Sequence, residues 1–502
     1  MFKLRFAVFF AVACCTLRAE TANGLGDTHF ATSCRPEVQG EFDRAVALLH
    51  SFEFTEAQKA FRDVEHRDPQ CPIAAWGVAL AQTQRVGANA SAKWLAAGWT
   101  ELQPWFAVKP GTPREQMYIE AVRSMYKGYG HIPGQERWNR YLQEMNSILK
   151  QFPDDPNGSM FYALGLVWTA GSGPEGLEQR RKALDILLPI FATHPNNPGA
   201  AHYIIHAADT PELAATALPA ARKYASIAPD SPHALHMPSH IFGRLGYWNE
   251  LIASNKRSAS AAAEWVASGK DGRFDEFHAL TYLDYGFLQM GKFGDAREQI
   301  TRIRDLMAGT GGDPWAQIDA RVLYDVQTRD WRDALLTQPP IGSPVKENFD
   351  VYWVHAIAAA NIGNIDSAKK SLRQLSDSVA QHKTAAYDDS LHLDLVQATA
   401  AVEAAMGKSE EAITTLKDAV HYEQQHPVDY PNVLTPPSAE LLGTLLLNLH
   451  RRSEATLAFQ TALELAPNTL HSIEGAKEAA SGIHPERCFR KRSAALCSSA
   501  IR

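Results

Sequence analysis

Histidines are concentrated in one part of the chain, at a spacing that suits metal binding. His202 and His206 lie four residues apart in AHYIIHAAD, and His236 and His240 lie four apart in HALHMPSHIF. On a helix, residues at this spacing share one face, with Cβ atoms about 5–6 Å apart. Two such pairs on neighbouring helices predict a mononuclear or dinuclear transition-metal site with imidazole ligands.

Other residues close to these pairs are candidates for the same site. His278, in FDEFHALTYL, is expected to point at the same patch from a third helix. His233, Asp209 and Tyr203 are candidates for further ligands or for hydrogen bonds that orient the rings. Imidazole suits zinc, copper and iron, so the ligand type does not select one metal. The alternative is that these histidines are structural and only pack or face solvent.

Familiar catalytic patterns do not account for the cluster. HYIIH and HMPSH lack the glutamate of an HExxH zinc protease. Ser239 beside His240 lacks a nucleophile elbow, and no GxxxxGK loop predicts a nucleotide cofactor. The nearest carboxylates, any of which could serve as a ligand or a base, are Asp209, Asp275, Glu276 and Asp284.

The helices that carry these side chains belong to a repeated hairpin pattern. In SAELLGTLLLNLHRRSEATLAFQTALELAP, the residues that fit the frame of a tetratricopeptide repeat (TPR) are Gly443, Ala455, Phe459, Ala462 and Pro467. The frame recurs near the start of the chain at Ala57, Phe61 and Pro69. A turn glycine followed five residues later by a packing alanine appears at Gly291/Ala296, Gly363/Ala368 and Gly407/Ala412.

Helical periodicity covers most of the chain and strand patterns are nearly absent, so we predict an all-α, TPR-like superhelical solenoid of stacked helical hairpins. The expected regions are a signal peptide (1–19), irregular helical repeats (30–190), His-rich repeats (191–310), clearer TPR-like repeats (345–480) and a basic tail with cysteines (481–502). In this frame His236 and His240 face the concave groove. Trp76, Trp94, Trp99, Trp105 and Trp168 could line the groove, although packing in the core is the simpler interpretation.

Pro238 leaves two geometries open for the second histidine pair. If the helix begins at Ser231-Pro232, a good cap and first position, then Pro238 removes the hydrogen bond to the Ala234 carbonyl and kinks the helix. If the helix begins near Leu235, the proline lies in the first turn and costs little. The two cases bring the histidine rings together differently.

The first residues read as an export signal. MFKLR is followed by the twelve-residue, largely apolar run FAVFFAVACCTL and by a possible cleavage site after Ala19. A lipid anchor on Cys14 ranks second. Cleavage removes three basic residues and no acidic one, which changes the net charge from -7 to -10. We therefore expect no nucleic-acid partner and, in the mature chain, no transmembrane segment.

Cleavage leaves four cysteines: Cys34, Cys71, Cys488 and Cys497. An exported chain meets an oxidising compartment, where disulfides are permitted. Of the three possible pairings, two local bridges are the simplest. No CxxC motif indicates a thiolate metal site.

Three segments carry a resemblance to a known group: SCRPEVQGEFDRAVALLHSFEFTEAQKAFRDVEHRDPQCPIAAWGVAL, HYIIHAADTPELAATALPAARKYASIAPDSPHALHMPSHIFGRLGYW and HALTYLDYGFLQMGK. They resemble exported bacterial TPR proteins over most of residues 30–480, and HYxxH…HxxHMPSHIF is the most specific part. The resemblance implies the repeat fold and a bridge between Cys34 and Cys71, and it implies no particular reaction.

Two functions follow from these observations. The first is an exported binding or scaffold protein whose groove holds a peptide, a protein or a small ligand, with a transition-metal site (Zn, Cu or Fe) at His202, His206, His236 and His240. The second is a metal-dependent hydrolase or oxidoreductase that uses the same histidines.

Overall fold

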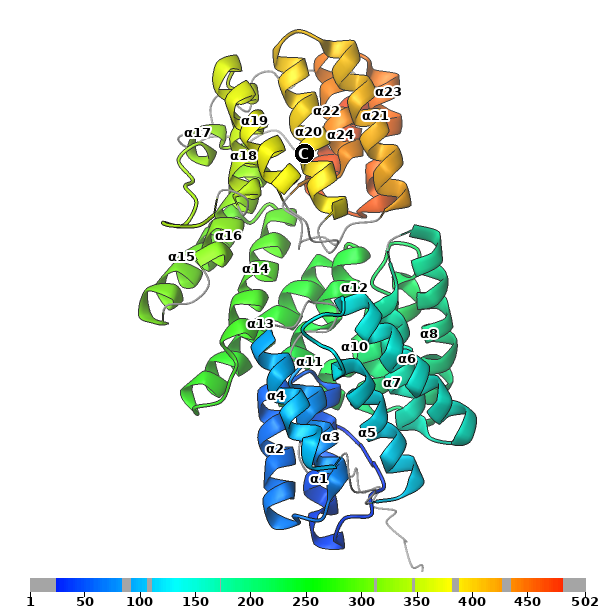
Figure 1. The fold of residues 1–502 in the computed structure, drawn as a ribbon. Helices are drawn as coiled ribbons and strands as arrows, with labels where there is room; N and C mark the ends of the chain where they lie inside the picture. Colours follow the sequence, from blue (N-terminus) through cyan, green and yellow to red (C-terminus); the bar gives the residue numbers. More distant parts are fainter. Residues whose placement is uncertain are drawn as a thin grey trace, which may run out of the picture.

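The computed structural model describes residues 24–83, 92–105, 111–171, 173–310, 314–344, 348–381, 388–426 and 435–481. Within these ranges the chain forms helices and no strand, so the predicted all-α class is confirmed. Figure 1 shows the N-terminal helices at one end, the central helices in the middle and the C-terminal helices packed as a block at the other end. Among the described residues, no helix combines the length and the apolar character needed to cross a membrane.

Consecutive helices pack as hairpins joined by short turns. The N-terminal half contains η1 (Pro36–Val38), α1 (Gln39–His50), α2 (Phe54–Arg67), α3 (Pro72–Ala81), α4 (Ala92–Leu102), η2 (Gln103–Trp105), α5 (Pro113–Tyr126), α6 (Gly134–Gln151), α7 (Pro156–Thr169), α8 (Gly173–Thr193), α9 (Pro198–Ala207) and α10 (Ala214–Ile227).

The remaining helices are α11 (Pro232–His236), α12 (Pro238–Arg244), α13 (Trp248–Ala267), α14 (Arg273–Gln289), α15 (Phe293–Thr310), α16 (Pro314–Thr328), α17 (Trp331–Ala334), α18 (Phe349–Asn361), α19 (Ile365–Gln381), α20 (Asp388–Ala405), α21 (Ser409–Gln425), α22 (Ser438–Asn448), α23 (Arg452–Leu465) and α24 (Leu470–Ser481).

The repeat frame predicted from the sequence is visible in the turns and in the packing. The turn glycines adopt positive φ angles, which are 66° at Gly291, 78° at Gly363 and 78° at Gly407. Glycine occupies this left-handed region without the steric cost that a Cβ imposes. The paired alanines, Ala296, Ala368 and Ala412, are fully buried. The turns and the helix packing of the TPR-like solenoid therefore follow the repeat frame that the sequence predicted.

Glycines also allow the helices of a hairpin to approach closely. A Cβ at Gly77 on α3 would lie 2.5 Å from the Phe61 ring of α2, and a Cβ at Gly443 on α22 would lie 2.9 Å from the Phe459 ring of α23. Both rings are buried. The first and last predicted repeats thus use the same packing, although about 370 residues separate them in the sequence.

The last helix of the C-terminal repeats contacts the central repeats. The indole Nε1 of Trp248 donates to the Asn468 carbonyl at 2.8 Å, and the amide of Leu470 donates to Gln289 Oε1 at 2.9 Å. His471 Nε2 lies 2.6 Å from the Gln327 carbonyl. These contacts hold the start of α24 against the start of α13 and against the C-terminal ends of α14 and α16.

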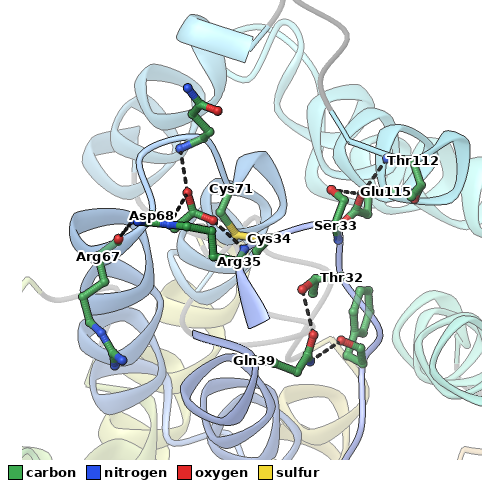
Figure 2. The surroundings of a disulfide bond; sticks show 12 residues. Thr32, Ser33, Cys34, Arg35, Gln39, Arg67, Asp68, Cys71, Thr112 and Glu115 are labelled. Atoms are coloured by element: carbon green, nitrogen blue, oxygen red, sulfur yellow. Dashed lines mark hydrogen bonds and ion pairs between the residues drawn. A yellow bond between two sulfur atoms is a disulfide. The ribbon is translucent and has the colours of Figure 1, made fainter. Parts of the chain in front are cut away.

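A disulfide between Cys34 and Cys71 fastens the N-terminal segment to the start of α3 (Figure 2). The Arg35 amide donates to Asp68 Oδ2 at 2.8 Å, and the amide and hydroxyl of Ser33 both donate to the Glu115 carboxylate at 2.7 Å. The pairing is the one that the resemblance implies. Cys14, Cys488, Cys497, the signal peptide and most of the tail (482–502) lie outside the described residues.

The apolar core runs along the array in successive clusters. The first cluster lies mainly between Leu25 and Phe161, the second between Met160 and Ala398, and the third between Ala400 and Ala479. Tyr162 and Trp168 pack against both the first and the second cluster. Helices α9, α11, α12 and α14, which carry the histidines, all contribute to the second cluster, so a packed core supports the site from behind.

Candidate metal centre

Helix α9 holds the first histidine pair. It begins after Asn197, whose side chain accepts a hydrogen bond from the Ala200 amide at 3.0 Å, and Pro198 fills the first helical position. His202 is fully buried and His206 is half-buried on the same face. The capped, enclosed helix fixes the position of both rings.

Helices α11 and α12 hold the second pair. Ser231 caps α11 by accepting a hydrogen bond from the Ala234 amide at 3.0 Å, and Pro232 follows at the first position. Of the two geometries that the sequence left open, the structure therefore has the early start, with a break before Pro238. Proline has no amide proton to donate to the Ala234 carbonyl, which explains the break. His236 and His240 nevertheless remain in contact across it.

His202, His206 and His233 form one group, here called the first triad. The Nε2 atoms of His202 and His206 are 3.0 Å apart, and one ring nitrogen from each of the three residues lies within 4.8 Å of the others. His202 Nδ1 lies 2.6 Å from the His50 carbonyl and donates to it. His233 Nε2 is buried without a hydrogen-bond partner.

His236, His240 and His278 form a second group, here called the second triad. The Nε2 atoms of His236 and His240 are 3.1 Å apart, and this group also lies within 4.8 Å. His236 Nδ1 is 2.7 Å from Asn255 Oδ1, and His240 Nδ1 is 2.9 Å from Asp209 Oδ2. The two triads adjoin each other, because the His233 and His236 ring centroids are 6.2 Å apart.

The hydrogen bonds of the second triad assign its ring protons. The Asn255 amide nitrogen donates to the Leu251 carbonyl at 2.9 Å, so Asn255 Oδ1 faces His236 as an acceptor. The Asp209 carboxylate likewise accepts from His240. Both Nδ1 atoms therefore carry the protons, and two Nε2 lone pairs face each other at 3.1 Å. A cation between them removes this repulsion, and the neutral donors fit a transition metal.

Burial favours the neutral rings that a metal requires. Burial, together with the neighbouring His240 and His233, lowers the pKa of His206 to about 3. Burial and neighbouring imidazoles also hold the pKa values of His202 and His236 well below the usual value for histidine. A proton is therefore disfavoured in the space between the facing Nε2 atoms at neutral pH, because the rings stay neutral. The Nε2 lone pairs are then free to bind a metal ion.

Asp209 links the second triad to a charged partner. Arg244 Nε donates to Asp209 Oδ1 at 2.8 Å while Oδ2 faces His240. Burial alone would raise the pKa of Asp209, but Arg244 and then His240 outweigh it and hold that pKa below its ordinary value. The carboxylate stays charged, and it orients the His240 ring as the carboxylate partners of metal-bound histidines do.

Aromatic rings enclose both triads. The Phe52 ring centroid lies 4.3 Å from that of His202 and 5.2 Å from that of His206, and Phe52 has a left-handed backbone with φ 56°. Tyr224 stacks on His202 at 5.2 Å. A bulky residue at positive φ is strained, and such strain is commonly found at functional sites.

The sequence-predicted residues divide between the two triads. The four histidines expected around one site fall into two pairs, joined by His233 in the first triad and by His278 in the second. Asp209 lies behind His240. The Tyr203 ring centroid lies 5.7 Å from that of His202, and the Tyr203 hydroxyl lies 2.8 Å from His50 Nδ1.

Of the other carboxylates and tryptophans predicted from the sequence, some lie near the first triad and some lie in the core. Asp275 Oδ1 is 3.6 Å from His233 Nδ1, whereas Asp284 is enclosed in the core and neither of its carboxylate oxygens has a hydrogen-bond partner. Trp76 is fully buried in the first apolar cluster. Trp168 lies beside Phe52, with ring centroids 6.0 Å apart, so it extends the group of aromatic rings around the first triad.

Sequence reasoning missed Asn255, the His50 carbonyl, Phe52 and Tyr282. His50 and Phe52 reach the site from the N-terminal part of the chain and Asn255 from α13, the helix after α12, and no local pattern marks them. Tyr282 has a signal, because it follows His278 by four residues, the spacing of the two histidine pairs. Cys34, Asp68 and Cys71 also lie close together, but the disulfide uses both sulfur atoms.

A cavity of about 880 Å³ lies away from the triads. The N-terminal segment around His29 forms one side, and the loop between α6 and α7 forms another. Arg114 lines the cavity and donates to both carboxylate oxygens of Asp155. None of the six triad histidines lines this cavity.

The similarities between this chain and known proteins are distant. No protein-family model matches the chain, and no curated protein sequence matches it. A chain of the APC/C hetero-tetramer Cut9–Hcn1 is 11% identical, with 88% of this chain and 76% of that chain covered and a TM-score of 0.38.

Two further solved structures are similar at the same level. A tetratricopeptide repeat protein from Parabacteroides merdae is 12% identical over 72% of this chain and 99% of that chain, with a TM-score of 0.27. A human IFIT1 dimer with m7Gppp-AAAA is 14% identical over 81% and 89%, with a TM-score of 0.39. At such scores these similarities carry no information about function.

Proposed function

We propose that this chain is an exported, TPR-like metal-binding protein that holds one transition-metal ion in each histidine triad. The observation that carries the proposal is the facing pair of Nε2 atoms in each triad, 3.0 Å and 3.1 Å apart. Two ligands on a tetrahedral ion with metal–nitrogen bonds of 2.0–2.1 Å lie about 3.3 Å apart, so each pair is close to the spacing of bound ligands.

The surrounding protein supports the same interpretation. His202, His236 and His240 each donate their Nδ1 proton to a fixed oxygen, which directs Nε2 inward. Metal-bound histidines almost always make such a bond. Zinc, copper and iron all suit imidazole ligands, and the ion would hold together helices α9, α11, α12 and α14.

The scaffold role and the export rest on separate observations. A TPR-like solenoid presents an extended concave surface, on which we infer that a peptide, a protein or a small ligand binds. The N-terminal segment has the pattern of a signal peptide, and the Cys34–Cys71 disulfide suits an oxidising compartment such as the periplasm or the outside of the cell.

A metal-dependent enzyme is the second candidate, and one observation favours it. Glu53 lies beside the first triad, where its carboxylate accepts hydrogen bonds from Ser231 Oγ at 2.6 Å and from the His233 amide at 3.2 Å. Burial, and then the nearby Asp275 charge, raise the pKa of Glu53 well above its usual value. A protonated carboxyl group at this position could give a proton to a metal-bound substrate.

The test is elemental analysis of the mature chain purified without an affinity tag, alongside His206→Ala and His240→Ala. We expect two ions per chain in the parent and one in each variant. His421→Ala, on the exposed face of α21, is the matched control and should keep both ions. Metal at background level in the parent, with unchanged thermal stability in the variants, would overturn the proposal.

Metal addition should also stabilise the folded chain. An ion at 100 times its dissociation constant adds about 2.7 kcal/mol at one site, because it binds the folded state alone. Loss of a reaction together with the metal in the same variants would favour the enzyme, and retention of both ions without any reaction would favour the scaffold.

A further inference from the structure

Asp350 and Asp394 occupy the same repeat position on two neighbouring helices of the C-terminal half. Asp350, on α18, precedes the turn glycine Gly363 by thirteen residues, and Asp394, on α20, precedes Gly407 by thirteen residues. Helices α18 and α20 pack against each other. Equivalent positions on stacked hairpins lie side by side, so the two aspartates are neighbours.

The same repeat position supplies one histidine to each triad. His233 precedes Gly246 by thirteen residues, and His278 precedes Gly291 by thirteen residues. Because the hairpins stack in one array, this position faces the same side of the solenoid in each repeat. The surface that carries imidazoles in the central repeats therefore carries carboxylates in the C-terminal ones.

The two carboxylates lack a compensating charge. Asp394 is 6% exposed and Asp350 is half-buried, and neither side chain has an ion pair or a hydrogen bond within the described part of the chain. Burial raises the pKa of Asp350 to about 7, and burial and then the Asp350 charge raise the pKa of Asp394 well above its usual value. Buried charges in proteins are normally paired or bound to a metal ion.

Gln397 adds a third oxygen on the same face of α20. It follows Asp394 by three residues and is 1% exposed. Its Nε2 donates to the Pro436 carbonyl and to Ser438 Oγ, both at 3.0 Å, on the side of α22. Its Oε1 therefore points away from α22, and it is buried without a hydrogen-bond partner. A buried acceptor of this kind calls for a ligand that carries positive charge.

We propose that Asp350, Asp394 and Gln397 form a binding site for a hard divalent cation of the Ca²⁺ class. Ca²⁺ takes six to eight oxygen ligands at about 2.3–2.6 Å from carboxylates, amide carbonyls and water. An oxygen set selects Ca²⁺, Mg²⁺ or Mn²⁺, whereas the imidazoles of the triads suit transition metals. Ligands spread over two helices suit the flexible coordination of Ca²⁺ better than the strict octahedron of Mg²⁺. The site is separate from the triads and does not depend on metal binding there.

The experiment titrates the metal-free mature chain with Tb³⁺, a luminescent probe for Ca²⁺ sites. Excitation of tryptophan should produce Tb³⁺ emission, because Trp353 follows Asp350 by three residues on α18. Ca²⁺ should abolish this emission at a lower concentration than Mg²⁺. Calorimetric titration with Ca²⁺ should give one ion per chain.

Asp394→Asn should bind Ca²⁺ about tenfold more weakly or worse, because the number of charged ligands sets the affinity of such sites. Asp350→Asn should show the same loss from the less buried position. Asp377→Asn, at an exposed position on α19, is the matched control and should bind as the parent does. Circular dichroism of each calcium-free variant checks that it is folded, which we expect because the change removes an uncompensated charge.

Two results would overturn the proposal. The first is a parent chain that binds neither Tb³⁺ nor Ca²⁺, or a Ca²⁺ affinity that is unchanged in both folded variants, since the carboxylates would then be protonated and not ligands. The second is Ca²⁺ binding that persists in Asp394→Asn and disappears in His206→Ala, which would place the ion at the triads.

Discussion

The two triads differ in how the protein orients their rings. In the first triad, His202 is oriented by a main-chain carbonyl and lies between two aromatic rings, Phe52 and Tyr224. In the second triad, side-chain oxygens from Asn255 and the charged Asp209 orient the rings. A carboxylate partner raises the basicity of the imidazole that it bonds. The second triad should therefore bind its ion more tightly than the first. Its affinity should also fall when the side chain that accepts a hydrogen bond from one of its histidines is replaced, whereas the main-chain acceptor of the first triad cannot be removed in this way.

Replacing Asp209 should have the largest effect. Asp209→Asn keeps the shape of the side chain but removes the charge that His240 and Arg244 share. Affinity at the second triad should fall about 10- to 100-fold, while the first triad keeps its ion. Isothermal titration with Zn²⁺ resolves the two binding steps.

Asp275→Asn is the matched control for that change. Asp275 approaches His233 Nδ1 only to 3.6 Å, which is too far for a hydrogen bond, so its loss should change binding little. Equal losses of affinity at both triads in Asp209→Asn would contradict the difference between them.

Acid should destabilise the metal-free protein. The pKa of His206 is lowered to about 3 in the folded chain, so the unfolded chain, with an ordinary pKa of about 6.5, binds more protons between these values. Stability is therefore complete above pH 6.5 and falls as the pH drops towards 3. Each such histidine contributes a slope of up to about 1.4 kcal/mol per pH unit.

Urea unfolding in the presence of a chelator, at pH 7.5 and at pH 5, measures this loss. The variant His206→Asn should show a shallower dependence on pH than the parent. A metal-free protein that is equally stable at both values, or more stable at pH 5, would show that the buried imidazoles protonate readily in the folded state.

Phe52 should have the smallest effect, confined to the first triad. Phe52→Leu keeps an apolar side chain but removes the ring that contacts His202 and His206. We expect a severalfold loss of affinity at the first triad and none at the second, read from the same titration. A change at the second triad would mean that the two sites are coupled through the shared helices.

The fold was largely predictable because its rules are local. Turn glycines with positive φ and buried alanines five residues later follow from the sequence frame. The cap at Ser231 and the break at Pro238 are one of the two geometries that the sequence left open. The histidine pairs were predictable for the same reason, since spacing on one helix brings side chains together.

Which histidines come together in each triad depends on how the helices pack against one another. The spacing of residues along the sequence does not determine that packing. His233 joins α9 residues and not its own helix neighbours, and Asn255 reaches His236 from α13. The packing of α11 on α9 and α14 determines which helix supplies the third histidine of each triad. The single four-histidine site and the two triads are consistent with the same sequence, and they differ only in that packing.

The most direct test of the central claim is a crystal structure of the mature chain grown with Zn²⁺ and measured at the zinc absorption edge. The account predicts two anomalous peaks, one bonded to His202, His206 and His233 and the other to His236, His240 and His278, with zinc–nitrogen distances of about 2.0–2.1 Å. A single peak shared by His202, His206, His236 and His240, or no peak at either triad, would contradict it.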